Sequence, residues 1–593
     1  MSTYTPPLQD ANFVLDQLIG IDQLCEELQL EDINTELASV IIEEAGKLAS
    51  EVLAPLNAVG DANGATVANG QVTETAGFAD AYEQFIANGW ATLTGPEQFG
   101  GQNLPNVLGT AVNELWHSSN MAFALCPMLS QGAVEALIAH GSDALKEQYL
   151  PPLISGEWTG TMNLTEPNAG SDLAAVAAKA VPSGDHYKIS GQKIFITWGD
   201  HQMTSNVVHL VLARLPDAPA GVKGISLFIV PKYRLDEQGQ PSELNDVSCI
   251  SLEHKMGIHG SPTCVMSFGD NDGAVGYLVG EKNKGLRYMF TMMNHARQTV
   301  GLQGLSISER AYQQALQYSQ ERFQGTHRDG SKIAIIEHPD VRRMLMAMKA
   351  GNEAMRALAF SAAADIDRAH NGDDSAKKRV ELYTPIVKGW MTELAQELTS
   401  LNIQVHGGMG FIEETGAAQH YRDARILPIY EGTTGIQALD LIGRKTLFDK
   451  GEALKGLHSD IEETINALKA SDNQSLSGFT AQLENALQRA TEAGNWILDN
   501  TAEDPRLMGN VSFDNLMMMG YLVGGWLMAR SALLASQQDS DNSAYSSAFL
   551  EGKIATASFY AEHYLPRVNQ HADTVLTGLK STFSLDIEQL QGA

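Results

Sequence analysis

Apolar residues recur every three or four positions through much of the first 158 residues. The segments "VLDQLIGIDQLCEEL", "ELASVIIEEAGKLASEVL" and "FADAYEQFIANGW" all show this spacing, which is typical of helices that bury one face. The pattern therefore predicts a helical region from about residue 10 to about residue 158.

The pattern changes between about residues 160 and 280. Short β-branched or aromatic runs, partly alternating and separated by Gly, Pro, Asp and Ser, predict strands in "HYKISGQKIFIT", "VVHLVLARL", "GISLFIV" and "CVMSFGD". Helical spacing returns after that and continues to the C-terminus, with breaks at "HNGDDS", "ASDNQSLSG" and "DNTAEDPRLMGN".

The chain has 593 residues, too many for one hydrophobic core. The patterns predict five parts: an N-terminal extension (1–35), a helical domain (36–158), a β domain (159–280), a helical bundle (281–450) and a further helical domain (451–593). The apolar run Leu516–Ala529, at 14 residues, is shorter than a membrane span and predicts a buried helix. Its Gly520-x-x-x-Gly524 spacing would let helices approach closely.

The net charge of the chain limits the kinds of partner it can bind. Lys and Arg number 40 against 71 Asp and Glu, a formal net charge of −31, which argues against sequence-independent binding to nucleic acid or to anionic lipid. The scattered cysteines predict a reduced compartment and no zinc site. The N-terminus "MSTYTPPLQD" lacks the features of a secretory signal. We therefore expect a soluble, cytoplasmic protein without stable membrane insertion and with no metal site.

Three segments carry polar residues in constrained settings. In "MNLTEPNAGSDL", Gly170-Ser171-Asp172 could bind an anion through backbone N–H groups or could form an ordinary surface turn. "QVHGGMGF" could allow a flat ligand to approach closely or could simply end a helix. In "ILPIYEGTTGIQ", Thr434-x-x-Gln437 has capping-box spacing, which predicts that Glu431 lies in the turn before a helix. Without other motifs, an acid stabilised by that helix N-terminus explains Glu431.

Four segments together carry more information than any one of them. "TEPNAGSD", "GQKIFIT", "QVHGGMGF" and "RDARILPIYEGT" follow the order and spacing of the acyl-CoA dehydrogenase family, which the chain resembles from about residue 40 to residue 445. The resemblance implies an α+β multidomain fold: an N-terminal α domain, a middle β-barrel-like domain and a four-helix bundle, with FAD held between β domain and bundle. Here an additional C-terminal α-helical domain follows.

The resemblance also implies a reaction, the oxidation of an acyl-CoA thioester to the trans-2-enoyl-CoA. In the family, the glutamate that matches Glu431 takes the α-proton, while the β-hydrogen leaves as hydride to flavin N5. Tyr430 and Gly432 would line the substrate. Some members place the base one residue before an arginine, but that position is Ala296 here. Glu431 is therefore the expected catalytic base.

Other roles follow from the resemblance, position by position. Leu164 and Thr165 match contacts to the flavin pyrimidine, Phe195 matches the aromatic that shields the flavin ring, and Thr197 matches the hydroxyl facing N5. The remaining matches are Ser171 (FAD pyrophosphate and CoA), Arg297 (CoA, or a salt bridge within the bundle), Arg322, Gln404, Gly407 and Gly408 (FAD across a dimer interface) and Thr433 (FAD).

The chain departs from the family pattern in three places. "ERFQGTHRDGSK" carries extra residues where R-x-x-F-G is usual, and Gly435 replaces a polar residue after Y-E-G-T. Residues from about 455 onward extend beyond the usual core. In larger relatives such an extension covers the surface that would bury a second dimer, so we expect a homodimer.

The chain most resembles a bacterial branch of about 600 residues whose members oxidise 3-methylmercaptopropionyl-CoA or fatty acyl-CoA. The expected substrate is accordingly 3-methylthiopropanoyl-CoA or a straight-chain fatty acyl-CoA, and the expected electron acceptor is an electron-transferring flavoprotein. An acyl-CoA oxidase that uses O2 is the alternative. A DNA-associated flavoprotein of the same fold is disfavoured by the net charge of −31.

Overall fold

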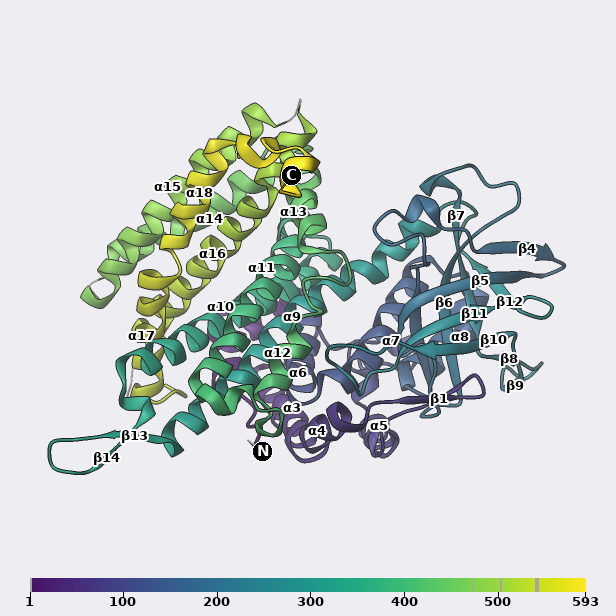
Figure 1. Ribbon diagram of the computed structural model, residues 1–593, viewed down its shortest axis with the longest axis horizontal. Helices are drawn as coiled ribbons and strands as arrows, with labels where there is room; N and C mark the ends of the chain where they lie inside the picture. Colours follow the sequence, from purple (N-terminus) through teal and green to yellow (C-terminus); the bar gives the residue numbers. More distant parts are fainter. Residues whose placement is uncertain (1–2, 472, 502–503, 539–542, 593) are drawn as a thin grey trace. The chain divides into compact units, whose positions relative to one another are not determined.

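The computed structural model describes residues 3–471, 473–501, 504–538 and 543–592 (Figure 1). The chain divides into two compact units, which we describe separately. The sheet unit comprises residues 45–105 and 115–299, and the helical unit comprises residues 1–44, 106–114 and 300–593.

The sheet unit is built around eight strands in the order β10-β11-β5-β12-β7-β6-β3, with β4 paired to β5 and β6. The pairs β3–β6 and β4–β6 are parallel and the others are antiparallel. The strands are β3 (Trp158–Asn163), β4 (Lys179–Ser183), β5 (His186–Thr197), β6 (Asn206–Arg214), β7 (Ile225–Pro231), β10 (Val247–Leu252), β11 (Thr263–Phe268) and β12 (Ala274–Val279).

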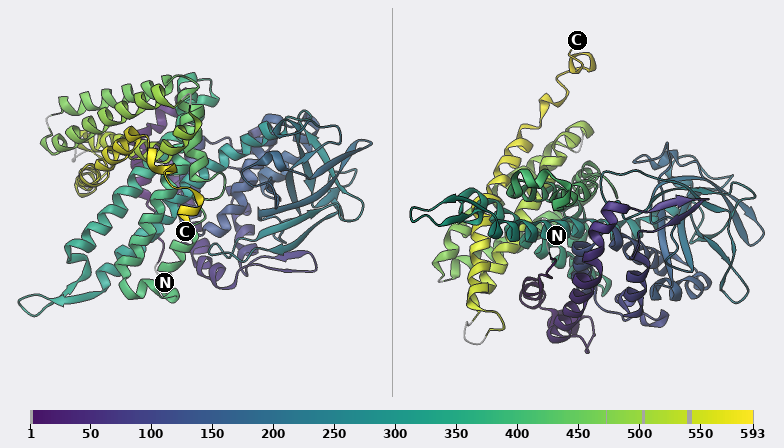
Figure 2. Two further views of the ribbon diagram at one scale, coloured as in Figure 1. Left: turned by 45° about the horizontal axis from the view of Figure 1, so that its top comes forward. Right: turned by 60° about the horizontal axis from the view of Figure 1, so that its bottom comes forward.

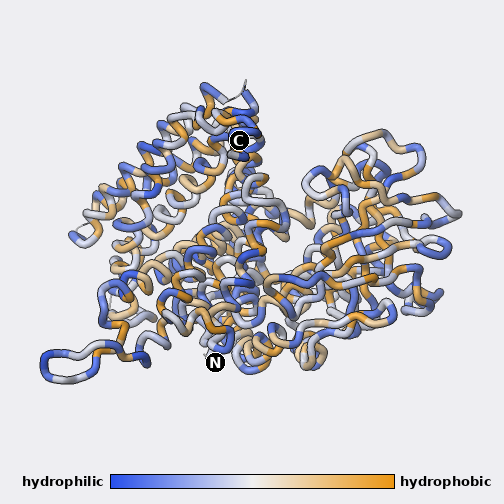
Figure 3. The backbone as a smooth tube through the Cα atoms, in the orientation of Figure 1, coloured by the Kyte–Doolittle hydropathy of each residue, from blue (hydrophilic) through white to orange (hydrophobic). Residues whose placement is uncertain are grey.

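Both faces of the central strands are covered, which explains why the β6 and β7 sequences are apolar almost throughout. Leu210 packs into a core cluster that includes helices α7 (Met121–His140) and α8 (Asp143–Ser155), whereas its neighbour Val211 packs into a cluster on the opposite face. Figure 3 shows the strands as mainly hydrophobic and many of the connecting loops as hydrophilic.

Most of residues 10–158 are helical, as predicted, but residues 88–105 contain only two short 3-10 turns, and two further places differ from the prediction. Gly20, with φ of +70°, divides the expected first helix into one segment ending at Ile19 and α2 (Ile21–Glu27). A two-stranded hairpin, β1 (Thr66–Ala68) and β2 (Gln71–Thr73), was not predicted. Its turn is Asn69-Gly70, with φ of +52° and +76°, the conformation that such a dipeptide favours in a tight hairpin. The main helices here are α3 (Thr35–Leu48), α4 (Ala54–Asn63), α5 (Phe78–Ala87) and α6 (Asn106–Ser119).

The helical unit contains long helices that lie side by side (Figures 1 and 2). Residues from 300 onward of α9 (Gly285–Glu321) belong to it, with α10 (Pro339–His370), α11 (Asp374–His406), α12 (Ala417–Ala424) and α13 (Thr434–Ile442). The C-terminal helices are α14 (Glu452–Ala470), α15 (Ser477–Asn500), α16 (Pro505–Gln537), α17 (Ser547–His563) and α18 (Pro566–Thr577). The helix α16 packs against α10, α11 and α13.

The predicted buried helix at Leu516–Ala529 is confirmed as part of α16. A Cβ at Gly520 would lie 2.0 Å from Trp390 Cγ, and one at Gly524 would lie 2.6 Å from Tyr560 Oη, so these glycines permit close helix contacts. Within the described ranges, α7 and α16 are long and apolar enough to span a membrane, but 83% and 89% of their most apolar windows are buried. Burial inside the protein accounts for their composition.

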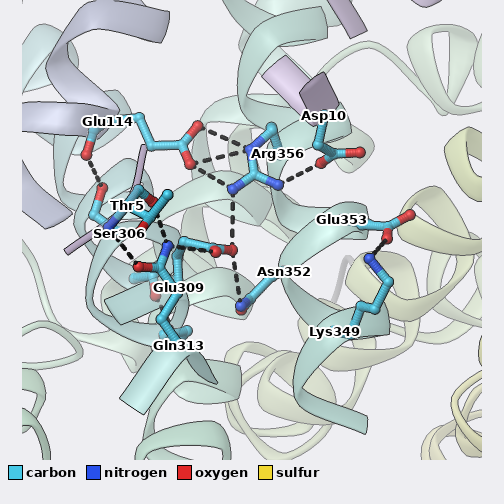
Figure 4. Close-up of polar contacts among 12 residues, drawn as sticks. Thr5, Asp10, Glu114, Ser306, Glu309, Gln313, Lys349, Asn352, Glu353 and Arg356 are labelled. Carbon is cyan, nitrogen blue, oxygen red and sulfur yellow. Dashed lines mark hydrogen bonds and ion pairs between the residues drawn. The ribbon is translucent and has the colours of Figure 1, made fainter. Parts of the chain in front are cut away.

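A buried ionic network joins distant segments of the helical unit (Figure 4). The guanidinium of Arg356 donates to both carboxylate oxygens of Glu114 at 3.0 Å, to Glu309 at 3.1 Å, and to Asp10 in α1 (Leu8–Phe13). Lys553 of α17 contacts Asp10 at 2.6 Å and Glu353 at 2.8 Å. Burial favours the protonated acid, but Lys553 and Arg356 together hold the pKa of Asp10 well below its usual value.

Candidate active site

Glu431 lies in the turn between α12 and α13, as predicted. Its φ of +54° is in the left-handed region, which is unusual for a residue with a side chain. The helix cap lies one residue earlier than the capping-box spacing predicts: Thr433 is the N-cap, and its hydroxyl accepts from the Ile436 N–H at 3.3 Å. Gln437 does not complete a capping box; its side-chain amide lies 3.5 Å from the Glu431 carbonyl oxygen.

Neighbouring side chains fix the Glu431 turn. The Tyr430 hydroxyl donates to the Gln303 side chain, and the Thr434 hydroxyl donates to Glu393 Oε1 at 2.6 Å. Burial, and then the adjacent Glu431 carboxylate, raise the pKa of Tyr430, so this phenol stays neutral at physiological pH. Gln303 and Glu393 were missed by sequence analysis, because neither lies within a recognised motif.

In the sheet unit, a β-bulge shapes the end of β5. Thr197 pairs with Thr263, Ile196 with Cys264, and Lys193 with Met266. Between the last two pairs, two residues of β5 oppose one residue of β11. The bulge contains Phe195, which has a φ of +59° and a side chain that is 59% exposed. A bulge re-aims side chains, and here it leaves a large aromatic ring accessible while Ile196 remains buried.

The segment that contains Leu164 and Thr165 is held against the same strand. The Thr165 carbonyl accepts from the Ile194 N–H at 2.9 Å, and the Leu164 carbonyl accepts from Lys193 Nζ at 3.0 Å. Lys193 also pairs with Glu166 at 2.8 Å, and both side chains are buried. Burial outweighs this pairing and lowers the pKa of Lys193 to about 8.

Lys193 and Glu166 were not identified as site residues from the sequence. Both occur inside quoted motifs, "GQKIFIT" and "TEPNAGSD", but nothing in the sequence shows that they pair. Glu166 additionally accepts from the backbone N–H groups of Ala177 and Ala178, at 2.7 and 3.0 Å. Ser171, by contrast, is exposed in the turn that follows.

The glycines of "QVHGGMGF" end α11, which confirms the helix C-cap. Gly407 has a φ of +60°, and a Cβ at Gly407 or Gly408 would meet no atom within 4 Å. The side chain of Gln404 is exposed beside them, and Phe411 is 84% exposed. These positions therefore leave room for a ligand.

The site residues predicted from the sequence also include two arginines. Arg322 is exposed and directly precedes β13 (Phe323–Thr326), which pairs with β14 (Lys332–Ala334) in a hairpin. This hairpin accounts for the extra residues in "ERFQGTHRDGSK". Arg297 is buried, with its guanidinium 5.8 Å from the centre of the Phe290 ring. The rival base position, Ala296, is buried and carries no acid.

The structure thus brings the predicted residues together in separate groups. Tyr430, Glu431, Gly432 and Thr433 share one turn of the helical unit, and Gln404, Gly407 and Gly408 share the end of α11. In the sheet unit, Leu164 and Thr165 lie against the β5 strand that carries Phe195 and Thr197. Across the described ranges, no cluster of three or more His, Cys, Asp or Glu suits a metal ion.

Family models match along nearly the whole chain. They describe an acyl-CoA dehydrogenase N-terminal domain (residues 35–157), middle domain (161–271) and C-terminal domain (283–447), and an acetyl-CoA dehydrogenase C-terminal-like domain (457–586). The chain is also 47% identical to the 3-methylmercaptopropionyl-CoA dehydrogenase of Ruegeria pomeroyi, over 97% of this chain and 99% of that protein. The chain belongs to the acyl-CoA dehydrogenase family.

Other acyl-CoA dehydrogenases are also similar to this chain. The broad-specificity linear acyl-CoA dehydrogenase FadE5 of Mycobacterium tuberculosis is 34% identical, over 99% of both chains. An acyl-CoA dehydrogenase of Bacillus anthracis, solved as a complex with FAD, has the same fold, with a TM-score of 0.74, 20% identity and coverage of 95% of this chain and 91% of that one. The predicted fold class is confirmed, and the protein is an oxidoreductase, an acyl-CoA dehydrogenase.

Proposed function

We propose that this protein is an FAD-dependent enzyme that converts an acyl-CoA thioester to the trans-2-enoyl-CoA, with Glu431 as the base that removes the α-proton. The observation that carries this proposal is the Glu431 turn. A left-handed φ of +54° holds this acid between a neutral tyrosine and a glycine, and such strain persists where a function depends on it.

Each side chain of the turn has a defined task. The Glu431 carboxylate accepts the α-proton, and the neutral Tyr430 next to it adds no competing charge. Thr433 caps α13 and Thr434 bonds Glu393, so the backbone around Glu431 stays fixed. The backbone N–H of Glu431 is proposed to donate to the thioester carbonyl, which makes the α-proton more acidic.

Several residues of this chain are suited to holding FAD. The exposed Phe195 ring offers an apolar face, the segment at Leu164 and Thr165 offers backbone groups beside it, and Thr197 adds a hydroxyl. At the end of α11, Gly407 and Gly408 provide the space that a backbone-bound ligand needs. FAD, when bound, supplies the acceptor for the hydride that leaves the substrate β-carbon.

For the substrate we propose 3-methylthiopropanoyl-CoA, with a short straight-chain acyl-CoA as the alternative. The relative named for the methylthio substrate is 47% identical, whereas the relative named for linear substrates is 34% identical. The two acyl groups are similar in shape, and one methylene discriminates by only about 1–3 kcal/mol. Sequence similarity therefore favours the methylthio substrate.

We further propose a cytoplasmic homodimer that passes its electrons to an electron-transferring flavoprotein. The packing of α16 over α10, α11 and α13 supports a dimer, because the C-terminal helices cover a surface of the bundle. Light scattering of the purified protein tests this, and a tetramer would contradict it.

The substrate test is an anaerobic titration of the purified yellow protein with 3-methylthiopropanoyl-, butanoyl-, octanoyl- and palmitoyl-CoA. We expect the first to bleach the oxidised flavin band at the lowest concentration. Reoxidation of the bleached protein by an electron-transferring flavoprotein should be faster than reoxidation by oxygen. The opposite order of rates would identify an oxidase, and bleaching by none of the four would overturn the proposed function.

A further inference from the structure

A cavity lies inside the helical unit, and no residue assigned to the dehydrogenase reaction lines it. Its volume is about 530 Å³, within the range of about 300–1,000 Å³ typical of small-molecule sites. The lining comes from the π-helical segment Val14–Ile19 and from helices α10, α11, α14 and α16. The cavity therefore needs both the N-terminal segment and the appended C-terminal helices, which lie outside the three models of the dehydrogenase core.

Part of the charge on the cavity wall is already paired. Arg379 donates to both carboxylate oxygens of Asp365, at 2.9 and 3.0 Å. Arg368 donates to Glu27 at 3.0 Å and lies 3.6 Å from Asp365. Bidentate and charge-assisted contacts of this kind satisfy both partners, so these two arginines are not the groups that need a ligand.

Arg530 differs from the other two arginines. Its Nη2 lies 3.4 Å from the Leu18 carbonyl oxygen, and its guanidinium lies 5.5 Å from the centre of the Trp526 ring. Among the residues that the structure describes, it forms no ion pair with a carboxylate. Burial lowers the pKa of Arg530, although Tyr383, Asp460 and Asp365 act in the opposite direction.

Asp460 on α14 also lines the cavity and is the acidic counterpart of Arg530. Within the described part of the chain it forms no ion pair. Burial raises its pKa, although Arg379 and Arg530 act in the opposite direction. Ser361 lines the same cavity, and its hydroxyl, which is buried, has no hydrogen-bond partner in the described chain. A buried polar group without a partner is uncommon and indicates a missing one.

The charge balance selects the class of ligand. Once the pairs of Arg368 and Arg379 are set aside, the lining retains Arg530, Asp460 and the exposed Glu463. A simple anion would satisfy Arg530 but add negative charge near two acids, and a simple cation would leave Arg530 unpaired. A molecule with one positive and one negative charge can pair with both Arg530 and Asp460.

We propose that this cavity binds a small zwitterion, whose carboxylate pairs with Arg530 and whose cationic group pairs with Asp460. Trp526 and Tyr383 form an aromatic part of the cavity wall. The site is independent of the proposed dehydrogenation, because it shares no residue with the Glu431 turn.

The test uses the purified full-length protein with three zwitterions of different cationic groups and lengths: glycine betaine, γ-aminobutyrate and L-carnitine. Propanoate and tetramethylammonium serve as single-charge controls. Calorimetric binding and thermal unfolding are measured for each. We expect at least one zwitterion to bind and to raise the Tm, while neither single-charge compound does so at the same concentration.

Variants then locate the binding. Arg530→Gln and the isosteric Asp460→Asn should each weaken binding by about tenfold or more, because each removes one charge-assisted contact. The matched controls are Arg506→Gln, on the same helix with its side chain 79% exposed, and Glu462→Gln on α14; both should bind normally. If Arg530→Gln does not fold, the binding measured for Asp460→Asn tests the proposal. Binding by none of the three zwitterions, equal binding of propanoate, or unchanged binding in Asp460→Asn would overturn the proposal.

Discussion

Lys193 shows how one buried side chain shapes the candidate flavin site. Its ammonium joins the Leu164 carbonyl and the Glu166 carboxylate to strand β5. Replacing Lys193 with Met would leave the Glu166 charge buried and unpaired. We expect a loss of about 3–5 kcal/mol in the free energy of unfolding, together with weaker flavin retention. Urea unfolding and the flavin content of the purified variant measure the two effects.

Lys188→Met is the matched control for Lys193→Met. Lys188 lies on the same strand, but its partner Asp272 is 90% exposed, and surface pairs contribute only about 0–1 kcal/mol. Equal destabilisation by the two substitutions, or full flavin content in Lys193→Met, would show that Lys193 does not position this segment.

At the scale of elements, His295 connects α9 to α7 within the sheet unit. Its Nδ1 lies 2.8 Å from Glu135 Oε1. Burial lowers and the Glu135 carboxylate raises the pKa of His295, and the net shift is upward. The folded state therefore binds this proton more tightly than the unfolded chain does. The resulting stability is fully present below the unfolded pKa of about 6.5 and is lost as pH rises through the folded pKa.

The pH prediction is tested by comparing wild type with His295→Gln. We measure the free energy of unfolding of both proteins between about pH 5.5 and pH 8.5, a window around the histidine pKa. The stability difference in favour of wild type should shrink as pH rises. A difference that stays constant or grows would contradict the assigned shift.

Elements with regular patterns could be predicted from the sequence, whereas local departures could not. The strand β5 has the bounds His186–Thr197 that the alternating pattern predicts, and α11 ends at the glycine pair as predicted. The bulge at Phe195 could not be predicted, because it depends on the register with β11. The Asn69-Gly70 hairpin, which was not predicted, has a local sequence signal in its Asn-Gly turn. The position of Glu431 before a helix was predicted, but its left-handed φ was not.

At the scale of the helical unit, contacts between residues far apart in sequence close the structure. Lys553 pairs with Asp10, and sequence patterns contain no signal for a pair separated by 543 positions. Lys553→Met would leave Asp10 and Glu353 short of a buried counter-charge. We expect a loss of about 3–5 kcal/mol in unfolding free energy and a lower Tm, measured by calorimetry.

The control for Lys553→Met is Lys455→Met on α14, whose side chain is 67% exposed and pairs with Glu452 on the surface. It should change the unfolding free energy by less than about 1 kcal/mol. If the two variants have the same Tm, the buried pair does not connect the N-terminal segment to the C-terminal helices.

The most direct test of the proposed function compares Glu431→Gln with Glu414→Gln, an exposed acid nearby in the sequence. Each flavin-loaded variant is mixed anaerobically with the best acyl-CoA, and bleaching of the flavin is followed over time. Glutamine cannot take the α-proton, so we predict that Glu431→Gln binds the acyl-CoA but loses at least about 100-fold in bleaching rate, while Glu414→Gln retains the wild-type rate. Bleaching at the wild-type rate in Glu431→Gln would show that this residue is not the base.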